Sequence, residues 1–234
     1  MTRKIFITGT GTDVGKTIVT RAVVRALVNR GVRLNAVKPV ESGVPMANGK
    51  LSPLDGSALL LAAKSEKSIA ETCRYMFQTP VSPHLAARLE NAKIDETEIY
   101  SFLESAASDC DILFAEGAGG LLVPLNDNIL YGDLIARAKA ELLIVAPNIL
   151  GTINSTLLTI DAARSRQIPV LGIILNKGEN DSLQNADAIS HFGNLPILGT
   201  FPIIDQLDDD EKLARAAEQH LNLEVFLSGA LHTC

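Results

Sequence analysis

The stretch Lys4-Ile-Phe-Ile-Thr-Gly-Thr-Gly-Thr-Asp-Val-Gly-Lys-Thr17 decides the fold of this chain. A short apolar run, Ile5 to Ile7, passes into a glycine-rich turn, and Gly15-Lys16-Thr17 opens a helical pattern. Small residues let backbone N–H groups curl around phosphate oxygens, while the lysine reaches the terminal phosphates and the threonine hydroxyl ligates Mg²⁺. The helix that follows points its positive N-terminal end at the same anion. This stretch therefore predicts a phosphate-binding loop.

The loop departs by one residue from the commonest spacing, G-x-x-x-x-G-K-[ST]. That spacing places its first glycine at residue 10, where the chain has Thr10 flanked by Gly9 and Gly11. The alternative interpretation is a glycine-rich turn between strand and helix that binds nothing. An apolar strand before the loop and a helix after it favour phosphate binding.

The composition restricts the class of protein. The chain has 234 residues, of which 47% are apolar and 21% charged, as in ordinary globular proteins. A net charge of −6 argues against nucleic acid or an anionic membrane as the main partner. The three cysteines have no paired spacing, which indicates reduced thiols. The start of the chain is not typical of a signal peptide, and no apolar run approaches the about 20 residues of a membrane span. We expect one large α/β domain, residues 1–234, in the cytoplasm.

Apolar runs alternate with helical patterns along the chain. The predicted strands are 5–7, 34–37, 111–115, 142–146, 170–175 and 196–199. The predicted helices are one that follows Lys16 and ends at Asn29-Arg30-Gly31, then 57–63, one that starts at His84, 131–139, 153–166, 182–191 and 208–221. Residues 41–53 and 200–202 are predicted as loops. Apolar strands that alternate with helices predict a mostly parallel sheet between two helical layers, a three-layer α/β/α fold of P-loop NTPase type.

Polar residues follow two of these strands, at the sheet edge where ligands bind in such folds. Lys38 follows strand 34–37 and can point into the same cleft as Lys16. Glu116 follows strand 111–115, where nucleotide hydrolases hold an acidic group for Mg²⁺. With Thr17 and Asp55, it would complete a magnesium site of hard oxygen ligands. The alternatives are that Lys38 is a solvated lysine at a turn and that Asp55 caps the following helix.

Asn176 and Lys177 follow strand 170–175. An asparagine at this place can hydrogen-bond the edge of a purine. Asn-Lys-Gly-Glu179 is close to the Asn-Lys-x-Asp motif with which GTPases bind guanine, but Glu179 replaces the aspartate. The residues alone leave the identity of the base open.

Five segments together resemble the dethiobiotin synthetase family, in order and spacing from residue 2 to about residue 205. They are Gly9-Thr-Gly-Thr-Asp-Val-Gly-Lys-Thr17, Lys38-Pro-Val-Glu-Ser-Gly43, Ser82-Pro-His84, Glu116-Gly-Ala-Gly-Gly120 and Gly151-Thr-Ile-Asn154. The resemblance implies a homodimeric ligase that uses ATP, Mg²⁺ and CO₂ to close a cyclic urea on 7,8-diaminopelargonate. A substrate amine takes up CO₂, the carbamate attacks the γ-phosphate, and the second amine closes the ring with release of phosphate.

The resemblance also implies roles for individual residues. Lys16 would neutralise the transferring phosphoryl group, Lys38 would hold the carbamate, and Ser42 would bind the nitrogen end of the substrate. A helix N-terminus in the neighbouring subunit would receive the substrate carboxylate. This second group of substrate contacts is Gly151, Thr152, Ile153 and Asn154. The implied nucleotide contacts are Thr12, Asp13, Val14, Gly15, Lys16, Thr17, Ile18, Asp55, Glu116, Asn176, Lys177, Pro202, Ile203 and Ile204.

Two other classes of protein share this type of loop and sheet. Amidoligases related to cobyrinate synthesis usually add a glutamine-hydrolysing domain, for which 234 residues leave no space. Switch ATPases of the plasmid-partition or septum-placing type have an extra lysine early in the loop, where this chain has Thr12 or neighbouring small residues. These differences favour the ligase.

Overall fold

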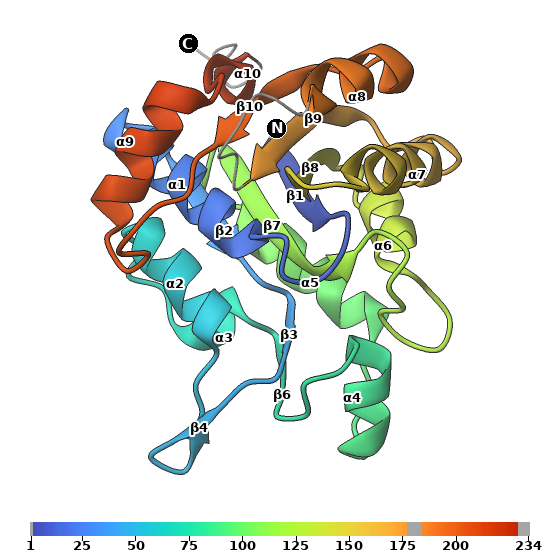
Figure 1. Cartoon of the computed structure of the whole chain (residues 1–234). Coiled ribbons are helices and arrows are strands. Elements are labelled where there is room, and N and C mark those ends of the chain that lie inside the picture. Colours follow the sequence, from blue (N-terminus) through green and yellow to red (C-terminus); the bar gives the residue numbers. More distant parts are fainter. Residues whose placement is uncertain (1, 177–183, 229–234) are drawn as a thin grey trace.

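A parallel sheet of six strands forms the centre of the fold in a computed structural model, which describes residues 2–176 and 184–228 (Figure 1). The strand order is β10-β9-β8-β1-β7-β2, and every neighbouring pair is parallel. The strands are β1 (Arg3–Gly9), β2 (Leu34–Val37), β7 (Ile112–Gly120), β8 (Glu141–Pro147), β9 (Val170–Asn176) and β10 (Ile197–Phe201). Because all six strands point the same way, their carboxyl ends meet at one edge of the sheet.

Helices cover both faces of this sheet (Figure 1). One face packs against α1 (Lys16–Asn29), α2 (Leu54–Ala62) and α9 (Asp210–His220). The other packs against α5 (Glu96–Ala107), α6 (Tyr131–Arg137), α7 (Thr152–Arg164) and α8 (Asn185–Gly193). Successive side chains of a strand point to opposite faces, so Ile5 and Ile7 belong to the first core and Phe6 to the second. The three-layer α/β/α prediction is confirmed.

Shorter elements complete the fold, most of them below the sheet in Figure 1 and one short helix near its top. A two-stranded parallel pair joins β3 (Val40–Ser42) to β6 (Tyr75–Phe77), and an antiparallel hairpin joins β4 (Met46–Ala47) to β5 (Lys50–Leu51). The short helices are α3 (Ile69–Thr72), α4 (Pro83–Leu89) and α10 (Glu224–Leu227). None of the helices in residues 2–176 and 184–228 is long and apolar enough to cross a membrane.

Each predicted strand of the sheet has a counterpart in the structure, but several predictions between strands are wrong. Residues 41–53 are not only loop, because they contain the end of β3 and the β4–β5 hairpin. The loop predicted at 200–202 starts too early, since β10 continues through Phe201. Residues 91–110, for which no element is predicted above, contain α5, whose N-cap Asp95 accepts a hydrogen bond from the backbone N–H of Thr97. Short elements and helix ends depend on contacts with distant segments, which local periodicity does not register.

Candidate active site

The loop between β1 and α1 has the backbone that a phosphate-binding loop needs. Gly15 is the N-cap of α1 and has a φ of 89°, in the left-handed region that favours glycine. A Cβ atom on Gly15 would lie 1.9 Å from Nδ2 of Asn176, so a larger residue would also clash. Among the described residues no side chain caps α1, and its first turn contains no acidic residue. Its first N–H groups and the positive end of its dipole therefore face the loop, where they can bind an anion.

The side chain of Asn176 holds the backbone of this loop in place. Asn176 is the last residue of β9, it is buried, and its Nδ2 donates a hydrogen bond to the carbonyl of Val14 at 2.8 Å. The side-chain amide is thus engaged with the loop, and its contact with a purine base stays a prediction. Lys177 and Glu179 lie outside the described residues.

Lys38 lies between two carboxylates beside the loop. Its Nζ is 2.5 Å from Oδ2 of Asp55 and 2.8 Å from Oε1 of Glu116. The side chains of Lys38 and Glu116 are 5% and 0% exposed, and that of Asp55 is 37% exposed. The sequence alternative of a solvated lysine is therefore wrong. Asp55 lies in the first turn of α2, whose N-cap is Pro53, so Asp55 is not the N-cap residue.

Two threonines of α1 also hold Glu116. The hydroxyl of Thr17 donates to Oε1 of Glu116 at 2.7 Å, and the hydroxyl of Thr20 donates to Oε2 at 2.9 Å. With Lys38, the wholly buried carboxylate has three donors, which compensates for its removal from water. Thr20 is a site residue that sequence analysis missed. The sequence does contain a signal for it: Thr20 is three residues after Thr17, a spacing that places both side chains on the same face of a helix.

The electrostatics of this cluster favour a charged lysine at its centre. Burial opposes the charged form of Lys38, but Glu116 and Asp55 outweigh it and raise the pKa of Lys38 above its ordinary value. Burial likewise works to raise the pKa of Asp55, yet the adjacent Lys38 lowers it overall. Burial lowers the pKa of Lys16, an effect that Glu116 opposes and Lys38 reinforces. Lys16 and Lys38 both line the cleft and can donate hydrogen bonds to phosphate oxygens, although Asp55 and Glu116 balance their charge when no ligand is bound.

A cleft of about 870 Å³ joins the loop and the lysine cluster. The predicted site residues that line it are Thr12, Asp13, Gly15, Lys16, Thr17, Ile18, Lys38, Ser42 and Asp55. Glu116, Val14 and Asn176 are buried next to it. Gly151 to Asn154, at the start of α7, and Pro202 to Ile204, after β10, do not contribute to its lining. The cleft is also lined by residues that were not predicted to belong to a site, among them Arg21, Glu41, Pro80 and Val123.

The donor atoms in this cleft fit magnesium in kind. The Thr17 hydroxyl and the carboxylates of Asp55 and Glu116 are hard oxygen ligands, and all three belong to the hydrogen-bonded cluster around Lys38. Among the described residues no group of three His, Cys, Asp or Glu side chains is arranged to hold a metal alone. A metal here would therefore also depend on phosphate oxygens.

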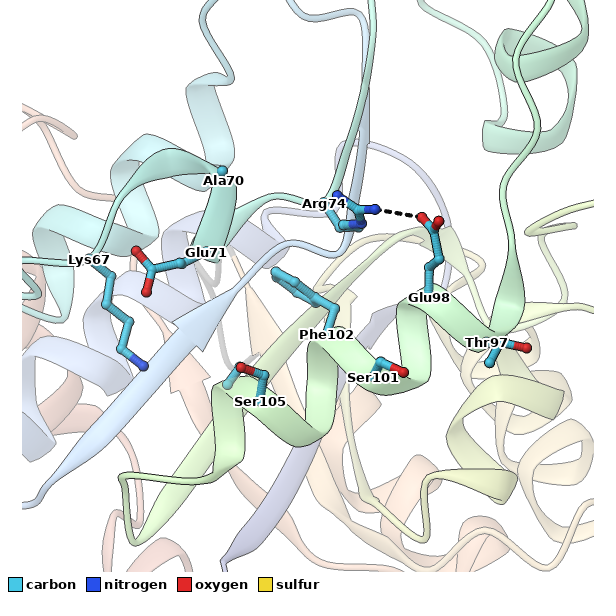
Figure 2. Close-up of a pocket in the computed structure, with 10 residues that line it drawn as sticks. Lys67, Ala70, Glu71, Arg74, Thr97, Glu98, Ser101, Phe102 and Ser105 are labelled. Atoms are coloured by element: carbon cyan, nitrogen blue, oxygen red, sulfur yellow. Dashed lines mark hydrogen bonds and ion pairs between the residues drawn. The ribbon is translucent and has the colours of Figure 1, made fainter.

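A second hollow, of about 370 Å³, lies between α3 and α5 and away from the loop (Figure 2). Figure 2 shows Arg74 paired with Glu98 across it and Phe102 on the α5 side. Its lining includes none of the predicted site residues.

The fold and the loop define a class of protein. A family model described as an AAA domain matches residues 3–211. A ParA family ATPase from Chlorobium tepidum superposes with a TM-score of 0.59 at 17% identity, and both chains are covered completely. The MinC:MinD cell division complex from Aquifex aeolicus gives a TM-score of 0.60 at 14% identity, with 99% of this chain and 97% of that chain covered. Identities this low show the fold alone. The family model and the phosphate-binding loop define the class: the chain is a P-loop NTPase-type protein.

Closer relatives identify the particular family. The ATP-dependent dethiobiotin synthetase BioD of Thermodesulfovibrio yellowstonii is 35% identical over 235 residues, which cover 95% of this chain and 98% of the relative. The protein of the same name from Halalkalibacterium halodurans is 37% identical over 221 residues, 91% of each chain. The chain belongs to the dethiobiotin synthetase family, and the resemblance noted in the sequence is confirmed.

Proposed function

We propose that this chain is an ATP-dependent ligase that closes the cyclic urea of dethiobiotin on 7,8-diaminopelargonate. The observation that carries the proposal is the position of Lys38, whose charged Nζ lies between Asp55 and Glu116 in the cleft that the phosphate-binding loop lines. A phosphate-binding loop serves many reactions. A second, buried cation beside the loop suits a reaction in which a negatively charged carbamate must approach ATP, because the cation offsets the negative charge of the carbamate.

The reaction has three steps. A substrate amine attacks CO₂ and loses a proton to give a carbamate. A carbamate oxygen then attacks the γ-phosphorus, the bond from that phosphorus to the β,γ-bridging oxygen breaks, and ADP leaves. The second amine finally attacks the carbamoyl carbon and loses a proton, phosphate leaves with the carbamate oxygen and takes up a proton, and the urea ring closes.

The two lysines divide the electrostatic work in this proposal. Lys16, on the loop, neutralises charge on the transferring phosphoryl group, and Lys38 holds the carbamate beside it. Its raised pKa keeps Lys38 protonated at neutral pH, so it acts as a fixed charge and hydrogen-bond donor rather than as a base. Ser42, which lines the same cleft, binds the nitrogen end of the substrate.

Magnesium is the cofactor that we propose for this site. Thr17, Asp55 and Glu116 would hold it together with phosphate and water, in keeping with the hard oxygens that these side chains supply. A bound Mg²⁺ neutralises charge on the phosphates of ATP.

The remaining contacts lie beyond the cleft. We propose that the N-terminus of α7, Gly151 to Asn154, binds the substrate carboxylate in a homodimer with sites at its interface. The backbone N–H groups at a helix start suit this role. Asn176 and the segment Pro202 to Ile204 are the proposed adenine contacts. The cytoplasm is the proposed compartment, which agrees with the free, buried thiols of Cys73 and Cys110.

Release of phosphate with one component omitted at a time tests the function. The purified protein, given diaminopelargonate, bicarbonate, Mg²⁺ and ATP, should release phosphate only when all four are present. Mass spectrometry of the complete mixture should show the cyclic urea. Phosphate release without diaminopelargonate would contradict the proposal and favour a switch ATPase.

A further inference from the structure

Glu41 is a buried carboxylate in the cleft that takes no part in the proposed reaction. It lies on β3, its side chain is buried, and it contributes to the lining of the cleft. Its Oε1 accepts a hydrogen bond from the backbone N–H of Asp55 at 3.0 Å, and its Oε2 accepts one from the N–H of Gly56 at 2.9 Å. Both N–H groups belong to the first turn of α2. One side chain thus ties β3 to the start of this helix.

The first turn of α2 depends on this contact because the helix has no side-chain cap of its own. Its N-cap is Pro53, which makes no capping hydrogen bond. The first four N–H groups of a helix have no partner inside the helix, and a negative charge beside them is stabilising. Glu41 supplies both a negative charge and two acceptors from a separate segment. Among the described residues it forms no ion pair, and these two N–H groups offset part of the cost of its burial, which on balance still raises the pKa of Glu41.

The other end of α2 is held independently of Glu41. Arg25, on α1, donates from Nε to the carbonyl of Ala62 at 2.9 Å and also hydrogen-bonds the carbonyl of Leu61. These are the last two residues of the helix. Removal of the Glu41 carboxylate should therefore loosen the first turn of α2 and leave its last turn in place.

That first turn contains Asp55, the least buried member of the cluster around Lys38. Neighbouring atoms confine Lys38 and Glu116 on all sides, whereas the place of the Asp55 carboxylate depends on how the helix start is anchored. We propose that Glu41 is a positioning residue, which holds the first turn of α2 so that the Asp55 carboxylate meets Nζ of Lys38. The effect of Glu41 on magnesium binding rests on the proposed function, in which Asp55 helps to hold the metal.

Amide hydrogen exchange tests the positioning directly, without ATP or metal. Loss of a helix cap amounts to a roughly 5- to 30-fold change in a local opening equilibrium. In Glu41→Ala we expect the amides of Asp55 and Gly56 to exchange faster by this factor, with no change at Leu61 and Ala62. Glu41→Gln should lie between, because its amide oxygen can still accept one hydrogen bond. Asp95→Ala is the matched control: it removes a carboxylate cap from α5 and should not change exchange in α2.

A magnesium titration of phosphate release tests the consequence for Asp55. Glu41→Ala should need several-fold more Mg²⁺ for half-maximal activity, Glu41→Gln less of an increase, and Asp95→Ala none. Unchanged exchange at Asp55 and Gly56 in either folded Glu41 variant would overturn the proposal, and Glu41→Gln decides the matter if Glu41→Ala does not fold. Faster exchange with an unchanged titration would overturn the link to the metal. Absence of diaminopelargonate-dependent activity in the wild type would contradict the proposed function, while the exchange result would still decide the role of Glu41.

Discussion

Two hollows in the described part of the chain contain the same kind of ion pair, one buried and one exposed to water. In the cleft beside the phosphate-binding loop, Lys38 pairs with Glu116 at 2.8 Å, and the two side chains are 5% and 0% exposed. In the hollow between α3 and α5, Arg74 pairs with Glu98 at 2.6 Å, and the side chains are 46% and 47% exposed. Water screens the exposed pair but not the buried one, so breaking the buried pair should cost more free energy although the two N···O distances are similar. Burial, rather than the presence of opposite charges, distinguishes the candidate active site.

The largest difference should appear in stability. Lys38→Ala leaves the buried Glu116 without its cation, and loss of one partner of a buried pair lowers the free energy of unfolding by about 3–5 kcal/mol. Arg74→Ala removes an exposed pair, for which we expect about 0–1 kcal/mol. Urea unfolding of both variants at neutral pH measures the difference. Equal losses would show that burial does not separate the two pairs.

The next largest difference between the two hollows should appear in the turnover number. Lys38→Ala should lower kcat about 10²- to 10³-fold, the effect of removing one group that stabilises developing charge. The Kd for ATP should change only a few-fold, since Lys16 and the loop remain. Arg74→Ala should leave both quantities unchanged. These constants are measured at a temperature where each variant is folded, and equal losses in kcat and ATP affinity would make Lys38 a nucleotide ligand instead.

A smaller effect should follow from removing one donor to Glu116. Thr20→Val keeps the shape of the side chain but deletes the hydrogen bond to Oε2 of Glu116, and we expect a loss of about 1–3 kcal/mol in unfolding free energy. Thr159→Val is the matched control. The hydroxyl of each threonine also lies 2.8 Å from the carbonyl four residues earlier, so Thr20 shares its one proton between that carbonyl and Glu116. Among the described residues, the Thr159 hydroxyl has no hydrogen bond to a carboxylate. Equal losses would assign the effect to that backbone contact.

The smallest expected effect is the loss of stability in acid that follows from protonation of Asp55. The pKa of Asp55 in the folded protein is below its ordinary value, because Lys38 outweighs the opposing effect of burial. Its contribution to stability should be complete above pH about 3.9 and disappear as the pH falls through the lower, folded-state value. The gap between wild type and Asp55→Asn in acid unfolding should therefore narrow below that pH. Glu98→Gln should leave the profile nearly unchanged, because solvent screens the pair.

Much of the fold follows from local patterns in the chain. The six strands appear as apolar runs, and the loop appears as Gly15-Lys16-Thr17 between a strand and a helix. The end of α1 at Asn29 and the left-handed Gly31 after it also agree with the predicted stop. By contrast, β3 and the β4–β5 hairpin are too short to produce a period of their own.

The candidate site was predictable in part. Lys38 and Glu116 are predicted to follow directly after two strands, but β7 continues to Gly120, so Glu116 lies within its strand. Only the pairing of β2 with β7 brings the two residues together. The support that Asn176 gives to the loop needs β9 beneath Val14, a contact across 162 residues. Glu41 stands within Lys38-Pro-Val-Glu-Ser-Gly43, yet nothing in that segment shows that it caps a helix that begins at Leu54.

The sequence by itself determined the kinds of element, the phosphate-binding loop and the family, because steric preferences, glycine and the alternation of apolar residues act over a few neighbours. The tertiary structure alone decided which strand ends meet, how deeply Lys38 is buried and which carboxylates face it. Those outcomes depend on the burial of surface summed over the whole chain, and no single segment contains that sum.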